Sequence, residues 1–233
     1  MVLINSALCK SSHVNLLPMS SAPLLKVTDL ACQRGDRLLY NDVSFIVAPH
    51  QCLHLIGANG TGKSSLLRQI AGLIDTNQVG QTEPVVFQPK PGQGIEHDSF
   101  AYLGHSDGLK PELTALENLQ FYARYFATSS SLDLDQCLFD VGLLACADLV
   151  VKHLSFGQRR RLSLARVLLN DARLWLLDEP LTGVDIKGRT LFMTLFVKHL
   201  DAGGAIILTH HQPLDQSSLA PYLHELRLDS EHL

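Results

Sequence analysis

The sequence lacks several patterns that define large classes of proteins. Its five cysteines are an odd number, are widely spaced and include no Cys-x-x-Cys pair, so neither a disulfide framework nor a zinc site is favoured. Charge, proline or histidine interrupts every apolar run well before the roughly 18 residues that a membrane-spanning helix needs. Internal repeats, low-complexity tracts and coiled-coil heptads are also missing. We therefore expect reduced thiols in a chain that does not cross a membrane by itself.

An excess of positive charge is missing as well. The formal net charge is -4 at pH 7, so the chain as a whole does not present the basic surface of a dedicated nucleic-acid-binding protein. Of its 233 residues, 46% are hydrophobic and 18% are charged, which is typical of a globular protein that buries a sizeable core. The three consecutive arginines Arg159–Arg161 are therefore a local feature, and we expect no nucleic-acid partner.

The N-terminal segment differs from the rest of the chain. Residues 1–21 have a single lysine and a broken apolar stretch, which match a secretory signal poorly and predict a flexible tail. Organised patterning begins just after Met19, which is an alternative translation start to Met1. The remainder, residues 22–233, is predicted to form one domain.

Short apolar segments alternate with helical patterns along this domain. Segments rich in apolar and β-branched residues predict strands over 24–30, 43–48, 52–58, 174–178 and 205–211. Apolar residues at helical spacing predict helices over 62–73, 114–126 and 186–200. The alternation indicates an α/β fold with a mainly parallel sheet. We further expect an antiparallel β layer from residues 24–48 and a helical insertion over about residues 106–165.

The strongest chemical signal is the segment GANGTGKS, which follows one predicted strand and begins a helix. Glycines permit a tight turn whose backbone N–H groups face phosphate oxygens, Lys63 adds a positive charge, and Ser64 offers a hydroxyl to Mg²⁺. The segment predicts a P-loop NTPase core that binds a nucleoside triphosphate. The predicted binding residues are Gly57, Ala58, Asn59, Gly60, Thr61, Gly62, Lys63, Ser64 and Ser65.

Two further strand ends carry polar side chains. The apolar strand over 174–178 ends in Asp178, a predicted Mg²⁺ partner, and the adjacent Glu179 can accept a proton from an attacking water. Hydrolysis is therefore predicted in addition to binding. The strand over 205–211 ends at His210 and His211, where an imidazole could touch the terminal phosphate.

The segment LSFGQ begins another predicted helix. Ser155 and Gln158 have the spacing of a capping box, which leaves unpaired N–H groups at a second anion site. One subunit cannot easily grip a triphosphate at two separate helix starts, so we expect a dimer in which each copy closes the nucleotide of the other. In the helix that follows, Leu162, Ala165 and Leu169 are expected to pack inward and the arginines to be mostly solvated.

These motifs, with LTGVD and THHQP, resemble in order and spacing the nucleotide-binding domain of ATP-binding cassette (ABC) transporters over about residues 22–228. The resemblance implies a sandwich dimer that hydrolyses two ATP molecules with Mg²⁺. It assigns Glu179 as general base, Asp178 and Ser64 as metal partners, and His211 or His210 as the switch histidine, of which His211 is favoured. It places five residues against the opposite subunit's nucleotide: Ser155, Phe156, Gly157, Gln158 and Asp185.

Two departures from the family pattern narrow the resemblance. His105 stands where the family usually has a glutamine, and Arg34 stands where an aromatic residue usually stacks on adenine, which a planar guanidinium could replace. With these features the chain is similar to the ATP-binding subunit of the haem exporter of bacterial cytochrome c maturation. That implies a peripheral subunit on the cytoplasmic face of the inner membrane, bound to integral membrane subunits. For His105 we predict a catalytic role, in which the imidazole hydrogen-bonds the metal-bound water and couples the site to the membrane partner.

The sequence itself gives no indication that this chain binds haem. A CxxCH motif is missing, so haem is expected to bind to the partners. Three alternatives stay open: another ABC exporter or importer, a soluble ABC ATPase that acts on nucleic acid, and a nucleotide sensor that does not hydrolyse. The transported molecule, its direction and the identity of the membrane partner are not encoded in these motifs.

Overall fold

A computed structural model of the chain describes residues 22–74, 85–87, 100–126, 133–210 and 216–228. Its centre is a five-stranded sheet in the order β5-β6-β7-β3-β8, and every pairing in it is parallel. The strands are β3 (Cys52–Ile56), β5 (Phe100–Leu103), β6 (Leu174–Asp178), β7 (Ala205–Thr209) and β8 (Leu223–Arg227). The predicted parallel α/β core is therefore confirmed. The predicted tail at residues 1–21 lies outside the described residues.

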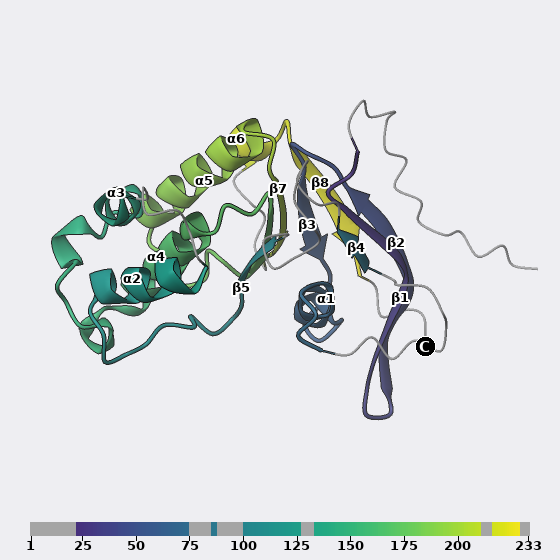
Figure 1. Ribbon diagram of the computed structural model, residues 1–233. Coiled ribbons are helices and arrows are strands. Elements are labelled where there is room, and N and C mark those ends of the chain that lie inside the picture. The colour runs from purple at the N-terminus through teal and green to yellow at the C-terminus, as the bar shows by residue number, and fades with distance from the viewer. Residues whose placement is uncertain (1–21, 75–84, 88–99, 127–132, 211–215, 229–233) are drawn as a thin grey trace, which may run out of the picture.

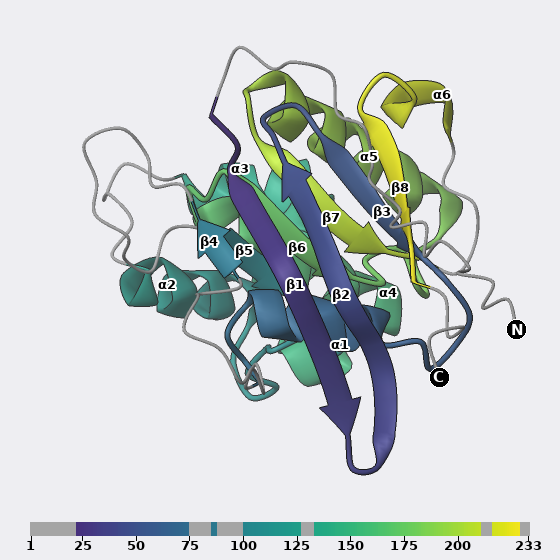
Figure 2. The ribbon, with the colours of Figure 1, turned by 90° about the vertical axis from the view of Figure 1, so that its right-hand side faces the viewer.

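A second sheet is antiparallel, as expected for the N-terminal region. It has the order β2-β1-β4, with β1 at Leu25–Arg34, β2 at Arg37–Val47 and β4 at Val85–Phe87. The hairpin between β1 and β2 extends past the first helix of the chain (Figures 1 and 2). The strand β4 is short and half exposed, and its sequence alone did not single it out.

Helices cover both faces of the parallel sheet. On one face α1 (Lys63–Ile70) lies between the two sheets, and on the other face the remaining helices gather into a lobe (Figure 1). The lobe consists of α2 (Ala115–Tyr125), α3 (Leu134–Asp140), α4 (Phe156–Leu169), α5 (Ile186–Asp201), α6 (Gln216–Leu219) and the 3₁₀ turns η1 (Leu144–Cys146) and η2 (Val151–His153). Of these, α2 to α4 and both turns belong to the connection between β5 and β6.

The central strand β6 shows why its sequence is a continuous apolar run. Leu174 and Leu176 pack into the core around α1, whereas Trp175 and Leu177 pack into the core under α4 and α5. Successive side chains of a strand point to opposite faces, so a strand covered on both faces is apolar at every position. Asp178 ends this run and is nonetheless buried.

The parallel topology gathers the predicted motifs at one edge of the sheet. Parallel strands place their carboxyl ends together, and ligands of such sheets bind beyond that edge. The loop GANGTG follows β3, Gly104 and His105 follow β5, Asp178 ends β6, and His210 follows β7. In register, Asp178 pairs with Thr209 of β7.

The structure also bears on two expectations from the sequence, one about membrane-spanning helices and one about the cysteines. Within the described ranges, no helix combines the length and apolarity required to span a bilayer. The cysteines that the structure describes, Cys32, Cys52, Cys137 and Cys146, are all free thiols. Burial raises the pKa of the Cys52 thiol to about 12, so this thiol stays protonated at neutral pH.

Candidate active site

The loop between β3 and α1 requires glycine at specific points. Gly57 and Gly62 have φ angles of 151° and 100°. A Cβ at Gly57 would lie 2.4 Å from the carbonyl oxygen of Leu228, and one at Gly62 would lie 2.8 Å from the ring of Tyr40. Both the backbone conformation and the lack of space therefore exclude side chains there. The β1–β2 sheet thus packs directly against the start of α1.

Lys63 is held inside this loop. Its side chain is buried, and Nζ donates hydrogen bonds to the carbonyl oxygens of Gly57 at 2.8 Å and Ala58 at 2.9 Å. Burial lowers the pKa of the ammonium group, while the nearby carboxylates of Glu179 and Asp178 act to raise it. The loop therefore encloses a positive charge at the amino end of a helix, which favours a bound anion.

Asp178 has one carboxylate oxygen in use and one without a partner. Its Oδ1 accepts hydrogen bonds from Ser64 Oγ at 2.9 Å and from Thr209 Oγ1 at 2.8 Å. Its Oδ2 is buried and has no hydrogen-bond partner. A buried carboxylate oxygen without a donor, beside a serine hydroxyl, fits a site for a hard divalent cation such as Mg²⁺.

Glu179 has an unusual backbone conformation. Its φ is 50°, in the left-handed region, which costs a non-glycine residue about 1–3 kcal/mol. Its amide donates to Thr209 Oγ1 at 2.9 Å, and its Oε2 accepts a hydrogen bond from Thr182 Oγ1 at 3.1 Å. The carboxylate therefore stands beside Asp178 at the sheet edge on a backbone that the surroundings hold in place.

The capping box at the start of α4 is confirmed. Ser155 Oγ accepts a hydrogen bond from the Gln158 amide at 3.2 Å, and Gln158 Oε1 accepts one from the Ser155 amide at 2.7 Å. The Gln158 side chain also lies 3.6 Å from Cys146 Sγ. Gln158 is thus engaged with its own helix, whereas the exposed Ser155 hydroxyl still has its proton to donate to a ligand.

The other residues predicted to face a second subunit lie near Ser155. The ring of Phe156 occupies the space that a Cβ on Gly183 would need, and a Cβ on Gly157 would lie 3.1 Å from the carbonyl oxygen of Gly183. Asp185 caps α5 by accepting from the Gly188 amide at 2.9 Å. The start of α4 and the turn before α5 therefore form one surface. Their contact with a second subunit stays a prediction.

Four residues that were predicted to belong to the site remain: His105, Arg34, His210 and His211. His105 is exposed and lies two residues after the end of β5, and Arg34 is exposed at the end of β1. His210 is buried, and its carbonyl oxygen lies 3.3 Å from Nε2 of the buried His54. His211 lies outside the described residues. The choice of His211 over His210, and the roles of His105 and Arg34, stay predictions.

The expectation that the arginines of α4 are mostly solvated is wrong. Arg160 is only 2% exposed. Arg159 and Arg161 are half-buried, and their Nη1 atoms donate to the carbonyl oxygens of Leu154 at 2.7 Å and Gly142 at 3.2 Å. The reason is that Arg160 lies one turn before Leu164, on the buried face of the helix. The inward packing of Leu162, Ala165 and Leu169 is confirmed.

Three functional contacts of the site escaped the sequence analysis. Thr209 bridges Asp178 and Glu179, Thr182 donates to Glu179, and Arg160 contacts the backbone at the end of β6. Thr209 had a detectable signal, because it is the polar last residue of an apolar strand. Arg160 could not be told from its neighbours in sequence, since all three arginines are adjacent.

Comparisons with known proteins agree with this geometry. Residues 40–182 match the ABC transporter family. The chain is 42% identical over 191 residues to the cytochrome c biogenesis ATP-binding export protein CcmA of Yersinia pestis, covering 82% of this chain and 87% of that protein. It is also 42% identical over 217 residues to CcmA of Pasteurella multocida, covering 91% and 98% of the two chains.

The fold is similar to that of a solved ABC transporter protein. The structure described as the ATP binding subunit of an ABC transporter superposes with a TM-score of 0.72 at 23% sequence identity, covering 88% of both chains.

Proposed function

Because this chain belongs to the ABC transporter family, we propose that it is the ATP-hydrolysing subunit of a haem exporter that serves cytochrome c biogenesis. The observation that carries the proposal is the 42% identity with proteins named as ATP-binding export proteins of cytochrome c biogenesis, over nearly their whole length. Haem is the prosthetic group of those cytochromes. The residues of this chain supply the ATP binding and hydrolysis that drive its export.

ATP binds at the loop between β3 and α1. The glycine turn presents its N–H groups to the phosphates, and Lys63, now held by the carbonyls of Gly57 and Ala58, turns its ammonium group to the terminal phosphates. Arg34 at the end of β1 stacks on the adenine ring. These contacts bind the nucleotide but do not cleave it.

Ser64 and Asp178 are the residues that would hold Mg²⁺. The fit rests on the buried, unpartnered Oδ2 of Asp178 and on the hydroxyl of Ser64, 2.9 Å from Oδ1. When bound, the ion neutralises charge on the phosphate oxygens and orients them. Thr209 fixes the carboxylate through its 2.8 Å hydrogen bond and so keeps Asp178 in place.

Glu179 is the general base. Its carboxylate takes a proton from water while the water oxygen forms a bond to the γ-phosphorus, and the bond from that phosphorus to the β,γ-bridging oxygen breaks. The products are ADP and phosphate. The backbone contacts of Glu179 hold this carboxylate at the carboxyl end of β6, next to Asp178.

A second copy of the chain completes each site. Ser155 and Gly157 at the start of α4, with Asp185 before α5, face the nucleotide bound to the other copy. The surface that these residues share supports this arrangement, because its helix start is capped within its own chain and its serine proton is available. The switch histidine, His211, contacts the terminal phosphate.

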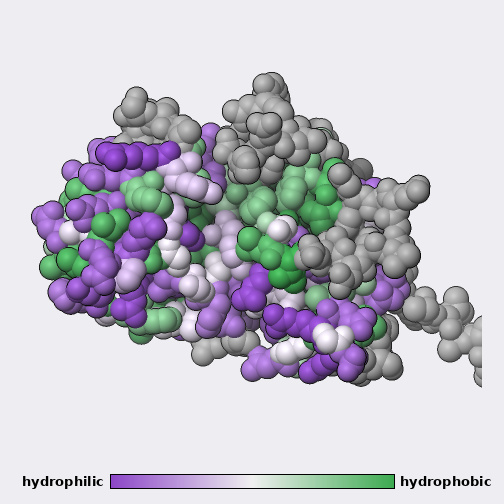
Figure 3. Space-filling model, turned by 60° about the horizontal axis from the view of Figure 1, so that its bottom comes forward, coloured by the Kyte–Doolittle hydropathy of each residue, from purple (hydrophilic) through white to green (hydrophobic). Residues whose placement is uncertain are grey.

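The helical lobe is the surface proposed to meet integral membrane subunits on the cytoplasmic side. Hydrophobic and hydrophilic residues are interspersed over it (Figure 3). Phe121 and Tyr125 of α2 line an open cavity of about 510 Å³, and Tyr125 is 73% exposed. Aromatic residues and arginine are enriched in protein interfaces, and Arg124 lines the same cavity.

The function is tested by purification from membranes. The tagged chain is expected to carry integral membrane subunits with it, and the complex to show the absorption spectrum of haem and to release phosphate from ATP. A complex with a different cargo and no haem would reassign the chain to another ABC exporter or importer. Recovery with nucleic acid and no membrane protein would contradict the transport role.

His105 is expected to serve hydrolysis and coupling, because it follows β5 beside the active site and begins the segment that leads into α2. The variant His105→Gln should keep ATP affinity within about twofold and lower the ATPase rate severalfold, since hydrogen-bonding groups that act only during reaction contribute to kcat. The measurement is steady-state phosphate release together with a cytochrome maturation assay.

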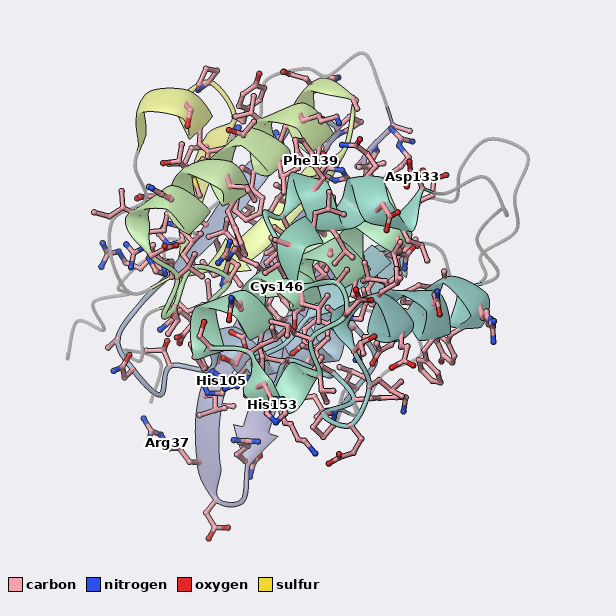
Figure 4. All side chains as sticks on the ribbon, turned by 90° about the vertical axis from the view of Figure 1, so that its left-hand side faces the viewer. Arg37, His105, Asp133, Phe139, Cys146 and His153 are labelled. Carbon is pink, nitrogen blue, oxygen red and sulfur yellow. The ribbon has the colours of Figure 1, made fainter. Side chains whose placement is uncertain are left out.

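The matched control for His105 is His153→Gln, which changes another exposed histidine of the helical lobe (Figure 4). This control should behave as the parent in both assays. If His105→Gln also matches the parent in both, His105 has no special role.

A further inference from the structure

One buried guanidinium joins three segments of the active site. Arg160 of α4 donates through Nη2 to the carbonyl oxygens of Asp178 at 2.5 Å and Glu179 at 2.9 Å, and through Nε to that of Pro180 at 3.3 Å. Its Nη1 donates to the carbonyl oxygen of Gly104 at 2.8 Å. One side chain therefore connects the helix that begins at Ser155, the end of β6 and the loop that carries His105.

The charge of Arg160 is partly balanced within this network. Burial lowers the pKa of Arg160, and the carboxylate of Asp107, 3.6 Å from Nη1, opposes this effect. Ser163 Oγ also donates to the Asp107 carbonyl oxygen at 2.9 Å, which fixes the loop to α4. A buried charge is costly unless it is paired and hydrogen-bonded, and an apolar side chain would fill the same space without that cost. Packing alone therefore does not explain an arginine at this position.

The contacts of Arg160 coincide with the unusual backbone of Glu179. Three consecutive carbonyl groups, from Asp178 to Pro180, turn toward one guanidinium group, and the residue at the centre of this turn has a φ of 50°. On the opposite side, the Glu179 amide donates to Thr209. The two peptide groups that flank the Glu179 side chain are thus held by Thr209 and by Arg160.

We propose that Arg160 is a positioning residue for hydrolysis, which holds the main chain of Glu179 and ties it to the loop from Gly104 to Asp107. The inference rests on the proposed function, in which Glu179 is the general base. A displacement of the loop that carries His105 then reaches Glu179 through one side chain. The hydrogen bonds of Arg160 go to main-chain carbonyl oxygens, so it acts on the rate through the position of Glu179.

The test compares three variants by steady-state ATPase kinetics. Arg160→Met keeps the length and loses every donor, and its kcat should fall about tenfold to a hundredfold, because small misplacements of a catalytic group have effects of that size. The KM for ATP should change less than about threefold, since the residues that bind the phosphates are untouched. Arg160→Lys retains one charged donor group and should recover part of the rate. The control Arg161→Met removes a guanidinium with one backbone contact, to Gly142, and should match the parent.

Two further measurements separate positioning from folding. Thermal unfolding identifies variants that lose the fold, and if Arg160→Met does not fold, Arg160→Lys decides. In the Glu179→Gln background, Arg160→Lys should cause no further loss of the residual rate, because two residues that act through one group are not additive. A folded Arg160 variant with the parent's kcat, or with kcat and ATP affinity lowered together, would overturn the inference. Normal hydrolysis by Glu179→Gln would instead overturn the assigned base of the proposed function.

Discussion

Replacing Glu179 with glutamine is expected to lower ATP hydrolysis about 10²- to 10⁴-fold, the usual contribution of a general base, and to leave ATP binding intact. The amide has the size and the hydrogen-bonding oxygen of the carboxylate, so the contact from Thr182 Oγ1 is preserved. It cannot accept the proton of the attacking water. Phosphate release measures the rate, and equilibrium binding of a fluorescent ATP analogue measures the affinity.

The same variant should accumulate dimers in the presence of ATP, because hydrolysis no longer separates the two copies that have closed around the nucleotide. Size-exclusion chromatography with and without ATP measures this. Glu225→Gln, which changes an exposed glutamate on β8, is the matched control and should hydrolyse ATP as the parent does. Loss of nucleotide binding in Glu179→Gln would show that Glu179 is structural.

A single negative charge at Ser155 should be as damaging as loss of the base. In Ser155→Asp the helix keeps a preferred capping residue, so α4 should still form. The new carboxylate would face the triphosphate bound to the second copy, and like charges brought together at an interface cost several kcal/mol. We expect loss of ATP-dependent dimers and a fall in hydrolysis of more than about 100-fold, since each 1.4 kcal/mol is a factor of ten.

The matched control is Ser155→Asn, which caps a helix as well as aspartate does and has nearly the same shape without the charge. It should retain most of the ATP-dependent dimer. Small-angle scattering in the Glu179→Gln background distinguishes dimers from monomers for both variants. An aspartate variant that still dimerises with ATP would contradict the proposed closure of each nucleotide by the other copy.

Those parts of the fold that depend on short-range patterns could be predicted from the sequence. The strand β6 is apolar at four consecutive positions and ends in Asp178, and α4 begins at a Ser155–Gln158 capping box that the structure reproduces. The loop before α1 is defined by glycines that no other residue can replace there. Because parallel strands end at a common edge, the meeting of these motifs also followed from the sequence.

The contacts that join distant segments could not be predicted in the same way. The burial of Arg160 depends on which face of α4 meets β6 and the loop after β5, and three adjacent arginines contain no sign of this. The left-handed backbone of Glu179 is likewise held by partners that are distant in sequence: Arg160 donates to its carbonyl oxygen, and Thr209 accepts from its amide. The short strand β4 has too few residues to show a periodicity.

All the helical segments from α2 to α4 belong to one crossover, which starts at Gly104 after β5 and returns to the sheet at β6. Its first residues carry His105, and its last helix carries Ser155 and Arg160. Both ends of this connection are therefore attached to the parallel sheet beside the active site. A partner that binds the crossover anywhere along its length would move both of its ends together. The active site would then need no separate connection to each end.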